Sequence, residues 1–211
     1  MIALNRVTKL YGSVIGVNDV TLSLPLGAYG LIGPNGSGKS TLLNLITGQL
    51  WPTQGTVRVF DAGPCNNPAV LRRLGVCPEL DALYADLSGF DWVAYLLRLH
   101  GFGRREARRR AEESLVRMGM GHAMHRRMGG YSRGMRQRLE LAQAFAHDPE
   151  VLILDEPLTG LDPVGRLEIT VPLQEWIRRG RGLLLASHLL HEVEAVTQSF
   201  LLICGGRLLA S

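Results

Sequence analysis

Hydrophobic positions follow two different periods along the chain, and the change of period marks its expected elements. Ile2–Leu10 and Val17–Leu24 alternate between apolar and polar residues, which predicts strands of an antiparallel patch. Val151–Leu154 and Leu183–Ala186 are nearly continuous apolar runs, as expected of strands buried on both faces of a parallel sheet. Further short strands are expected at Ala28–Ile32, Thr56–Phe60 and Leu74–Cys77.

Helical spacing occupies most of the remaining chain. Lys39–Leu50 should end before Trp51-Pro52, because proline stops a helix. Three helices are expected in succession and two more near the end, at Ser88–Leu99, Arg104–Met118, Met135–Ala146, Pro163–Arg179 and Leu189–Val196. This order predicts one α/β domain over residues 1–211, with a mainly parallel sheet, an N-terminal antiparallel β patch and a helical insertion at about 85–147.

Composition favours a globular protein of the cytosol. The apolar share of 46% and the charged share of 20% are ordinary for a folded chain. No run approaches the roughly 18 apolar residues of a membrane span, and residues 1–6 lack the layout of a signal peptide. Cys65, Cys77 and Cys204 are widely spread, which predicts reduced thiols and no disulfide or zinc site.

Positive charge is modest, with a formal net charge of +4. The densest basic run, Arg104–Arg110, contains Glu106 and is followed by Glu112 and Glu113. Interleaved acids at this spacing predict the solvated face of a helix. No aromatic residues alternate with these arginines in the way that proteins stack bases, so no nucleic-acid partner is expected.

Residues 33–41 match the phosphate-loop pattern G-x-x-x-x-G-K-[ST] between an expected strand and an expected helix. Glycines let successive N–H groups turn toward phosphate oxygens, and the N-terminus of the helix adds its positive dipole end. Lys39, one of only two lysines, supplies charge for the β- and γ-phosphates, and the Ser40 hydroxyl can bind Mg²⁺. The expected nucleotide-binding residues are Gly33, Pro34, Asn35, Gly36, Ser37, Gly38, Lys39, Ser40 and Thr41.

Two acids end the apolar run 151–154. A strand that ends in Asp155 places this carboxylate at the C-terminal edge of the sheet, near the phosphate loop, where it can organise Mg²⁺. Glu156 follows directly and can face the γ-phosphate and polarise the attacking water. The pair alone is a weak pattern, and the phosphate loop upstream makes it a specific one.

A second candidate phosphate surface lies at Tyr131–Arg138, which reads Tyr-Ser-Arg-Gly-Met-Arg-Gln-Arg. A serine and a glycine at the start of a helix can face phosphate, but the chain's own loop already fills that role. Such a surface is useful if it closes over the nucleotide of another copy. The segment therefore predicts a machine of two ATPase modules.

Together these motifs resemble the nucleotide-binding domain of ABC transporters over nearly all of the chain. The resemblance is carried by residues 33–41, Tyr131–Met135, Leu154–Pro157, Gly160–Pro163 and Ser187-His188. It implies two ATP molecules and Mg²⁺ bound between two head-to-tail copies of the domain. The residues to which it gives roles are Ser132 and Gly134 on the γ-phosphate of the opposite chain, Asp162 at the dimer seam, His188 on the γ-phosphate and Glu156, and Tyr11 stacked on adenine.

Three positions depart from the family pattern. Arg133 and Met135 replace the second glycine and the glutamine of the usual Leu-Ser-Gly-Gly-Gln signature, a form that resembles the ABC-2 type exporters. Glu79 stands where the family carries a glutamine that senses Mg²⁺, and its charge would either tighten Mg²⁺ or weaken ATP binding. Leu158 stands where threonine is common, a change expected to affect packing only.

The resemblance implies the ATP-hydrolysing subunit of an exporter, at the cytoplasmic face of the membrane, with a separate integral membrane permease that 78–90 contacts. A soluble ABC-type ATPase of translation, DNA repair or chromosome organisation is the alternative, and a P-loop kinase is a third. Tyr11 has an alternative as an ordinary strand-end aromatic residue. His122, His125 and His191 are expected at the surface and not in a metal site.

Overall fold

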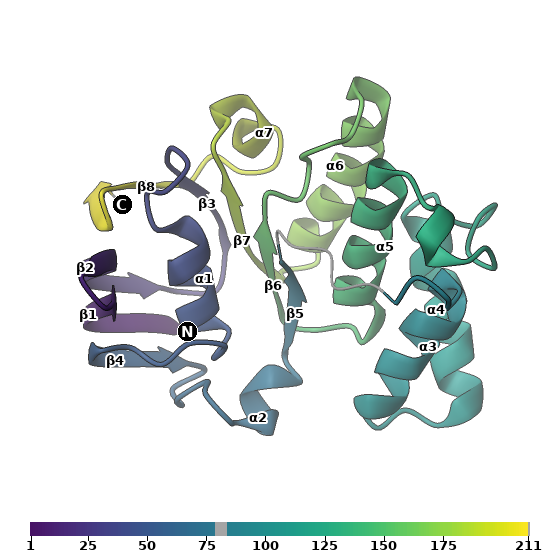
Figure 1. The fold of residues 1–211 in the computed structure, drawn as a ribbon, viewed down its shortest axis with the longest axis horizontal. Coiled ribbons are helices and arrows are strands. Elements are labelled where there is room, and N and C mark those ends of the chain that lie inside the picture. Colours follow the sequence, from purple (N-terminus) through teal and green to yellow (C-terminus); the bar gives the residue numbers. More distant parts are fainter. Residues whose placement is uncertain (79–83, 211) are drawn as a thin grey trace.

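The computed structural model describes residues 1–78 and 84–210, and its centre is a twisted, mainly parallel sheet (Figure 1). In spatial order its six strands are β5 (Leu74–Cys77), β6 (Val151–Asp155), β7 (Gly182–Ser187), β3 (Ala28–Ile32), β8 (Phe200–Cys204) and β9 (Arg207–Ala210). Neighbours pair in parallel except β9, which runs antiparallel to β8. The C-terminal ends of β3, β6 and β7 therefore meet at one edge of the sheet.

A second sheet of three antiparallel strands lies beside the N-terminus, as the alternating pattern predicts. Its order is β2 (Val14–Leu24), β1 (Ile2–Tyr11) and β4 (Gln54–Val59). α1 (Lys39–Ile46) contacts this sheet through β2 and β4 and the large sheet through β6, so it fills the space between them (Figure 1).

Two hydrophobic clusters cover opposite faces of the large sheet. Along β6, Leu152 and Leu154 point into one cluster while Val151 and Ile153 point into the other. These four side chains are almost fully buried. Burial on both faces explains why this strand is apolar throughout instead of alternating.

One cluster joins the large sheet to a group of helices. It is formed with α3 (Gly89–Leu99), α4 (Arg104–Arg117), α5 (Arg133–Ala146) and α6 (Pro163–Arg178). α5 contacts β5 as well as α3 and α4, so it lies between the sheet and the outer helices (Figure 1). The shorter helices are α2 (Pro68–Leu71), α7 (Leu190–Glu194) and the 3-10 turn η1 (Met128–Gly130). No helix within the described ranges is both long enough and apolar enough to cross a membrane.

The expected boundaries differ from the structure mainly at α1 and at the last strands. α1 ends at Ile46, not at Leu50, because Gly48 takes a left-handed φ of 74° and the Thr47 hydroxyl donates to the carbonyl of Leu43 (3.0 Å). Glycine in this conformation commonly ends a helix. β8 and β9 were not expected, since 200–210 offers short strands around a two-glycine turn.

Candidate functional site

The loop between β3 and α1 has the conformation that the phosphate-loop pattern predicts. Gly36 and Gly38 have φ angles of 77° and 105°, which other residues rarely adopt. A Cβ added to Gly38 would lie 2.4 Å from the carbonyl oxygen of Gly16, so only glycine fits there. The hydroxyl of Ser37 is buried and has no hydrogen-bond partner among the described residues. A curled loop with an unused buried hydroxyl fits a ligand rich in oxygen.

The loop borders an open cavity of about 500 Å³. Its lining residues are Tyr11, Val14, Ile15, Gly16, Asn35, Gly36, Gly38, Lys39, Ser40, Thr41, Asp155 and Glu156. The structure thus brings Tyr11 of β1 to the same cavity as the loop, with its hydroxyl 3.5 Å from that of Thr41. Gly33, Pro34 and Ser37 belong to the loop but are not in this lining.

An apolar wall of this cavity was missed by the sequence analysis. Val14 and Ile15 are the first two residues of β2, and 64% and 52% of their surface is exposed beside Tyr11. Gly16 lies under the ring, since a Cβ there would approach Tyr11 to 2.8 Å. Two exposed β-branched residues next to an aromatic residue were the available signal, because exposed apolar surface at a cavity is a mark of a binding site.

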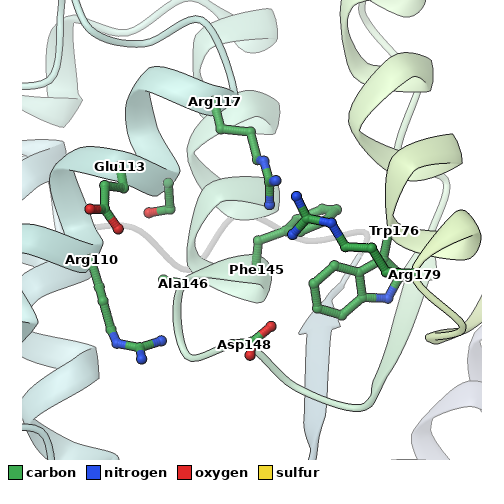
Figure 2. Close-up of a pocket in the computed structure, with 9 residues that line it drawn as sticks. Arg110, Glu113, Arg117, Phe145, Ala146, Asp148, Trp176 and Arg179 are labelled. Atoms are coloured by element: carbon green, nitrogen blue, oxygen red, sulfur yellow. The ribbon is translucent and has the colours of Figure 1, made fainter.

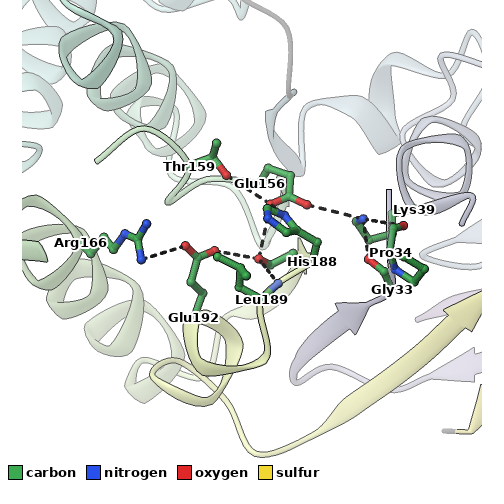
Figure 3. Close-up of polar contacts among 10 residues, drawn as sticks. Gly33, Pro34, Lys39, Glu156, Thr159, Arg166, His188, Leu189 and Glu192 are labelled. Carbon is green, nitrogen blue, oxygen red and sulfur yellow. Dashed lines mark hydrogen bonds and ion pairs between the residues drawn. The ribbon is translucent and has the colours of Figure 1, made fainter. Parts of the chain in front are cut away.

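Lys39 is buried, with 6% exposure, and its ammonium group lies inside the loop (Figure 3). It donates to the carbonyl oxygens of Gly33 (2.8 Å) and Pro34 (3.3 Å). Its Nζ also lies 3.6 Å from Oε1 of Glu156. A lysine held in this way places a compact positive charge next to the backbone of the phosphate loop.

Asp155 is the last residue of β6 and is almost fully buried, as the end-of-strand pattern predicts. It lines the cavity together with Ser40, the second residue of α1. A carboxylate and a hydroxyl are hard oxygen donors of the kind that Mg²⁺ takes, with water and substrate phosphates completing the shell. The donors present therefore fit Mg²⁺. Among the described residues no group of three or more His, Cys, Asp and Glu could hold a metal by itself.

Glu156 lies between Lys39, the first residue of α1, and His188, which follows β7 (Figure 3). It has a left-handed φ of 50°, and its backbone N–H donates to the carbonyl oxygen of Ala186 in β7 (2.9 Å). A non-glycine residue rarely takes this conformation without tertiary support. Its Oε2 lies 2.9 Å from Nδ1 of His188 and accepts from the Thr159 hydroxyl (3.3 Å). The strained turn aims the carboxylate across the sheet edge toward Lys39 and His188.

Behind this carboxylate lies a buried polar network that the sequence analysis missed (Figure 3). The Ser187 hydroxyl lies 2.7 Å from Oε2 of Glu192 and 3.4 Å from Oε2 of Glu156. A hydroxyl has one hydrogen, and the shorter distance assigns it to Glu192. Glu192 is 2% exposed, and its other oxygen lies 3.4 Å from Arg166 of α6. A carboxylate is rarely buried without a partner, but the burial of Glu192 is visible only in the structure, so the sequence carried no signal for this network.

The expected contacts to a second copy lie on other elements. Ser132 caps α5 by accepting from the N–H of Met135 (3.2 Å), and Asp162 caps α6 by accepting from the N–H of Gly165 (3.0 Å). Gly134 lies in the first turn of α5, where an added Cβ would lie 3.4 Å from Leu161. Neither Ser132, Gly134 nor Asp162 lines the cavity at the phosphate loop. Glu79 falls outside the described residues.

The fold and the loop define a P-loop nucleotide-binding protein of the α/β class. The model of the ABC transporter family matches residues 17–159. The chain therefore belongs to the ABC transporter family.

Relatives of this chain are named as ATP-binding proteins. The ABC transporter ATP-binding protein NatA of Bacillus subtilis is 36% identical, and the match covers 93% of this chain and 81% of NatA. The Nod factor export ATP-binding protein I of Cupriavidus pinatubonensis is 34% identical and is covered over 65% of its length. A dimeric ATP-binding cassette in a post-hydrolysis state with ADP and Pi has the same fold, with a TM-score of 0.91, 23% identity and coverage of 100% of this chain and 97% of that one.

Proposed function

We propose that the chain is the ATP-binding and ATP-hydrolysing subunit of an ABC exporter. The observation that carries the proposal is the position of Glu156 between Lys39 and His188 at the phosphate-loop cavity. The export role is supported by the relative whose name records Nod factor export. This chain covers 65% of that relative's length, so the transported substrate and the direction of transport are part of the proposal.

In this proposal the loop residues and Lys39 hold the phosphates of ATP, and Tyr11 packs on its base. Glu156 takes a proton from the attacking water, and His188 holds the carboxylate in place through the contact at 2.9 Å. When ATP binds, Lys39 would leave its contact with Glu156 and bind phosphate oxygens instead. The Glu156 carboxylate would then be available to accept the proton of the water. Ser40 and Asp155 would hold Mg²⁺, which neutralises charge on the phosphates when bound.

Ser132 and Gly134 then contact the ATP of a second copy, and Asp162 lies at the seam between the two copies; none of the three lines the cavity of its own chain. The closed pair would drive a separate membrane permease, which places the subunit at the cytoplasmic face of the membrane. Such a two-copy arrangement is supported by the dimeric cassette of the same fold.

The test is Glu156→Gln in the purified chain with ATP and Mg²⁺. We expect ATP binding to persist and turnover to fall by roughly 100-fold or more, because a general base contributes at least that factor. Undiminished hydrolysis would exclude the role of Glu156. Stimulation of wild-type ATPase activity by a co-reconstituted permease tests the exporter role separately.

A further inference from the structure

A second cavity, of about 310 Å³, lies between α4, the end of α5 and α6 (Figure 2). Arg110 and Arg117 come from α4, and Arg179 follows the last residue of α6. Figure 2 shows the side chains of Arg117 and Arg179 directed toward one another above Phe145 and Trp176. None of its lining residues lines the phosphate-loop cavity.

The two carboxylates in this lining are already paired with arginines from outside it. Glu113 lies 2.6 Å from Arg109, and Asp148 lies 2.9 Å from Arg181. Neither Arg109 nor Arg181 lines the cavity. Asp148 is thus compensated by Arg181, while Glu113 shares Arg109 with Glu106, which lies 2.6 Å from the same guanidinium group.

Two of the arginines that line the cavity, Arg117 and Arg179, lack a close acidic partner among the described residues. Arg110 is paired with Glu106 through its Nε (2.7 Å), and its guanidinium group lies 4.6 Å from the centroid of the Phe102 ring, while its terminal nitrogens make no hydrogen bond to a described residue. Arg117 approaches Glu175 only to 3.9 Å. Arg179 has no acidic partner within 1–78 and 84–210. Arg117 and Arg179 point toward one another, and two like charges in this arrangement repel, so an anion between them would remove that repulsion.

A cation near the C-terminus of a helix also stabilises that helix, which accounts for Arg117 and Arg179 separately. It does not account for their convergence, because each could serve its own helix while pointing into solvent. Trp176 is 2% exposed, so its ring is covered and offers no face on which a base could stack. Recognition in this cavity would therefore rest on charge and guanidinium geometry.

We propose that this cavity binds a phosphate-bearing anion through Arg110, Arg117 and Arg179. Phosphate suits the site because its several oxygens accept the paired N–H groups of a guanidinium. A free polyphosphate and a phospholipid headgroup carry the same chemistry. Binding would bridge α4 and α6, the two helices that face each other across the cavity.

Isothermal titration with inorganic pyrophosphate tests the site. Arg117→Ala combined with Arg179→Ala removes it, and Arg178→Ala removes an exposed arginine of the same helix end that does not line the cavity. The phosphate loop is intact in every protein, so a difference between them belongs to the arginine cavity. We expect the double variant to lose one binding event, or at least roughly tenfold in affinity, while Arg178→Ala matches the wild type.

Equal isotherms for the wild type and the double variant would overturn the proposal. Far-UV circular dichroism checks folding, and Arg117→Lys with Arg179→Lys serves as a second variant that keeps the charge but loses the paired N–H groups. This lysine variant should bind pyrophosphate more weakly than the wild type. Its remaining binding should disappear as the salt concentration is raised. Wild-type affinity in it would count against recognition by guanidinium groups.

Co-sedimentation with phosphatidylcholine vesicles, with and without phosphatidic acid, distinguishes a phospholipid headgroup from a free phosphate compound as the ligand. Binding only to phosphatidic acid vesicles, lost in the double alanine variant and kept in Arg178→Ala, identifies a lipid headgroup. Binding of pyrophosphate without vesicle binding identifies a free phosphate compound. Binding of both probes that does not depend on Arg117 and Arg179 rejects the site.

Discussion

The Nδ1 atom of His188 lies 2.9 Å from Oε2 of Glu156, and this contact joins the residues that follow β7 and β6. The other oxygen of the same carboxylate faces Lys39 at 3.6 Å. The two contacts leave the carboxylate little freedom to rotate. Ser187 and Glu192 lie on the far side of it, so the position of His188 depends on residues beyond the cavity.

Glu192→Gln tests whether this network positions Glu156 and His188. The amide would weaken the bond to Ser187 and remove the charge opposite Arg166, which lets the turn at 187–189 shift. We expect kcat for ATP to fall roughly 10- to 100-fold, as small misplacements of reacting groups do, with ATP affinity unchanged. Glu194→Gln is the matched control, because Glu194 is exposed on the same helix. Equal kcat values for the two variants would assign Glu192 to packing alone.

Ser132 combines a capping role with its proposed role on the ATP of a second copy, and Ser132→Asp separates them. Aspartate caps helices about as well as serine, so the unfolding free energy should stay within about 0.5 kcal/mol of wild type. Its charge would oppose a phosphate, so hydrolysis should be lost. Ser132→Ala should lose both hydrolysis and about 1 kcal/mol of stability. Urea unfolding and phosphate release measure the two effects, and wild-type turnover in Ser132→Asp would contradict the shared site.

Gly38→Ala should damage the phosphate loop more than an ordinary glycine substitution. Its φ of 105° and the carbonyl of Gly16 at 2.4 Å from an added Cβ both oppose a side chain. Gly12→Ala is the control, because Gly12 also has positive φ, at 61°, but has no atom within 4 Å of the added Cβ. We expect about 1 kcal/mol of destabilisation for Gly12→Ala from backbone strain. Gly38→Ala should cost more in urea unfolding and should also lose ATP binding; equal costs would show that the Gly16 contact is unimportant.

Local patterns were sufficient to place the phosphate loop and the two acids. The strand before Gly33, the helix from Lys39 and the apolar run before Asp155 each follow from a few adjacent residues. The early end of α1 could have been found from Gly48, whose conformational freedom competes with Pro52 as the helix terminator.

Contacts between distant elements could not be predicted in the same way. The ion pair of Arg166 with Glu192 depends on how α6 and α7 pack, and nothing in either segment specifies it. Val14 and Ile15 become a wall of the cavity only because β2 brings them beside the phosphate loop. Side-chain networks of this kind are set by tertiary packing, so the sequence revealed the candidate site residues but not the residues that contact them from other elements.

His147 provides a test of stability against pH. The pKa of His147 is lowered from 6.5 to about 4. Burial is the largest cause, and the positive charge of nearby His100 is the second. The two rings stack with centroids 4.2 Å apart, and Nε2 of His147 lies 3.0 Å from the carbonyl oxygen of Leu74, where the neutral ring donates. Arg110 lowers the pKa further, while Asp148 and the bond to Leu74 oppose the shift.

The unfolded chain binds a proton at this residue near pH 6.5, and the folded chain does so only near pH 4. The unfolding free energy should therefore be highest above pH 6.5 and fall by up to about 3 kcal/mol as the pH drops to 4. His147→Gln keeps a donor for Leu74 but does not titrate, so its urea midpoint should depend less on pH over this window. His122→Gln, at an exposed position, should keep the wild-type slope. The same slope in His147→Gln and wild type would mean that another group controls acid unfolding.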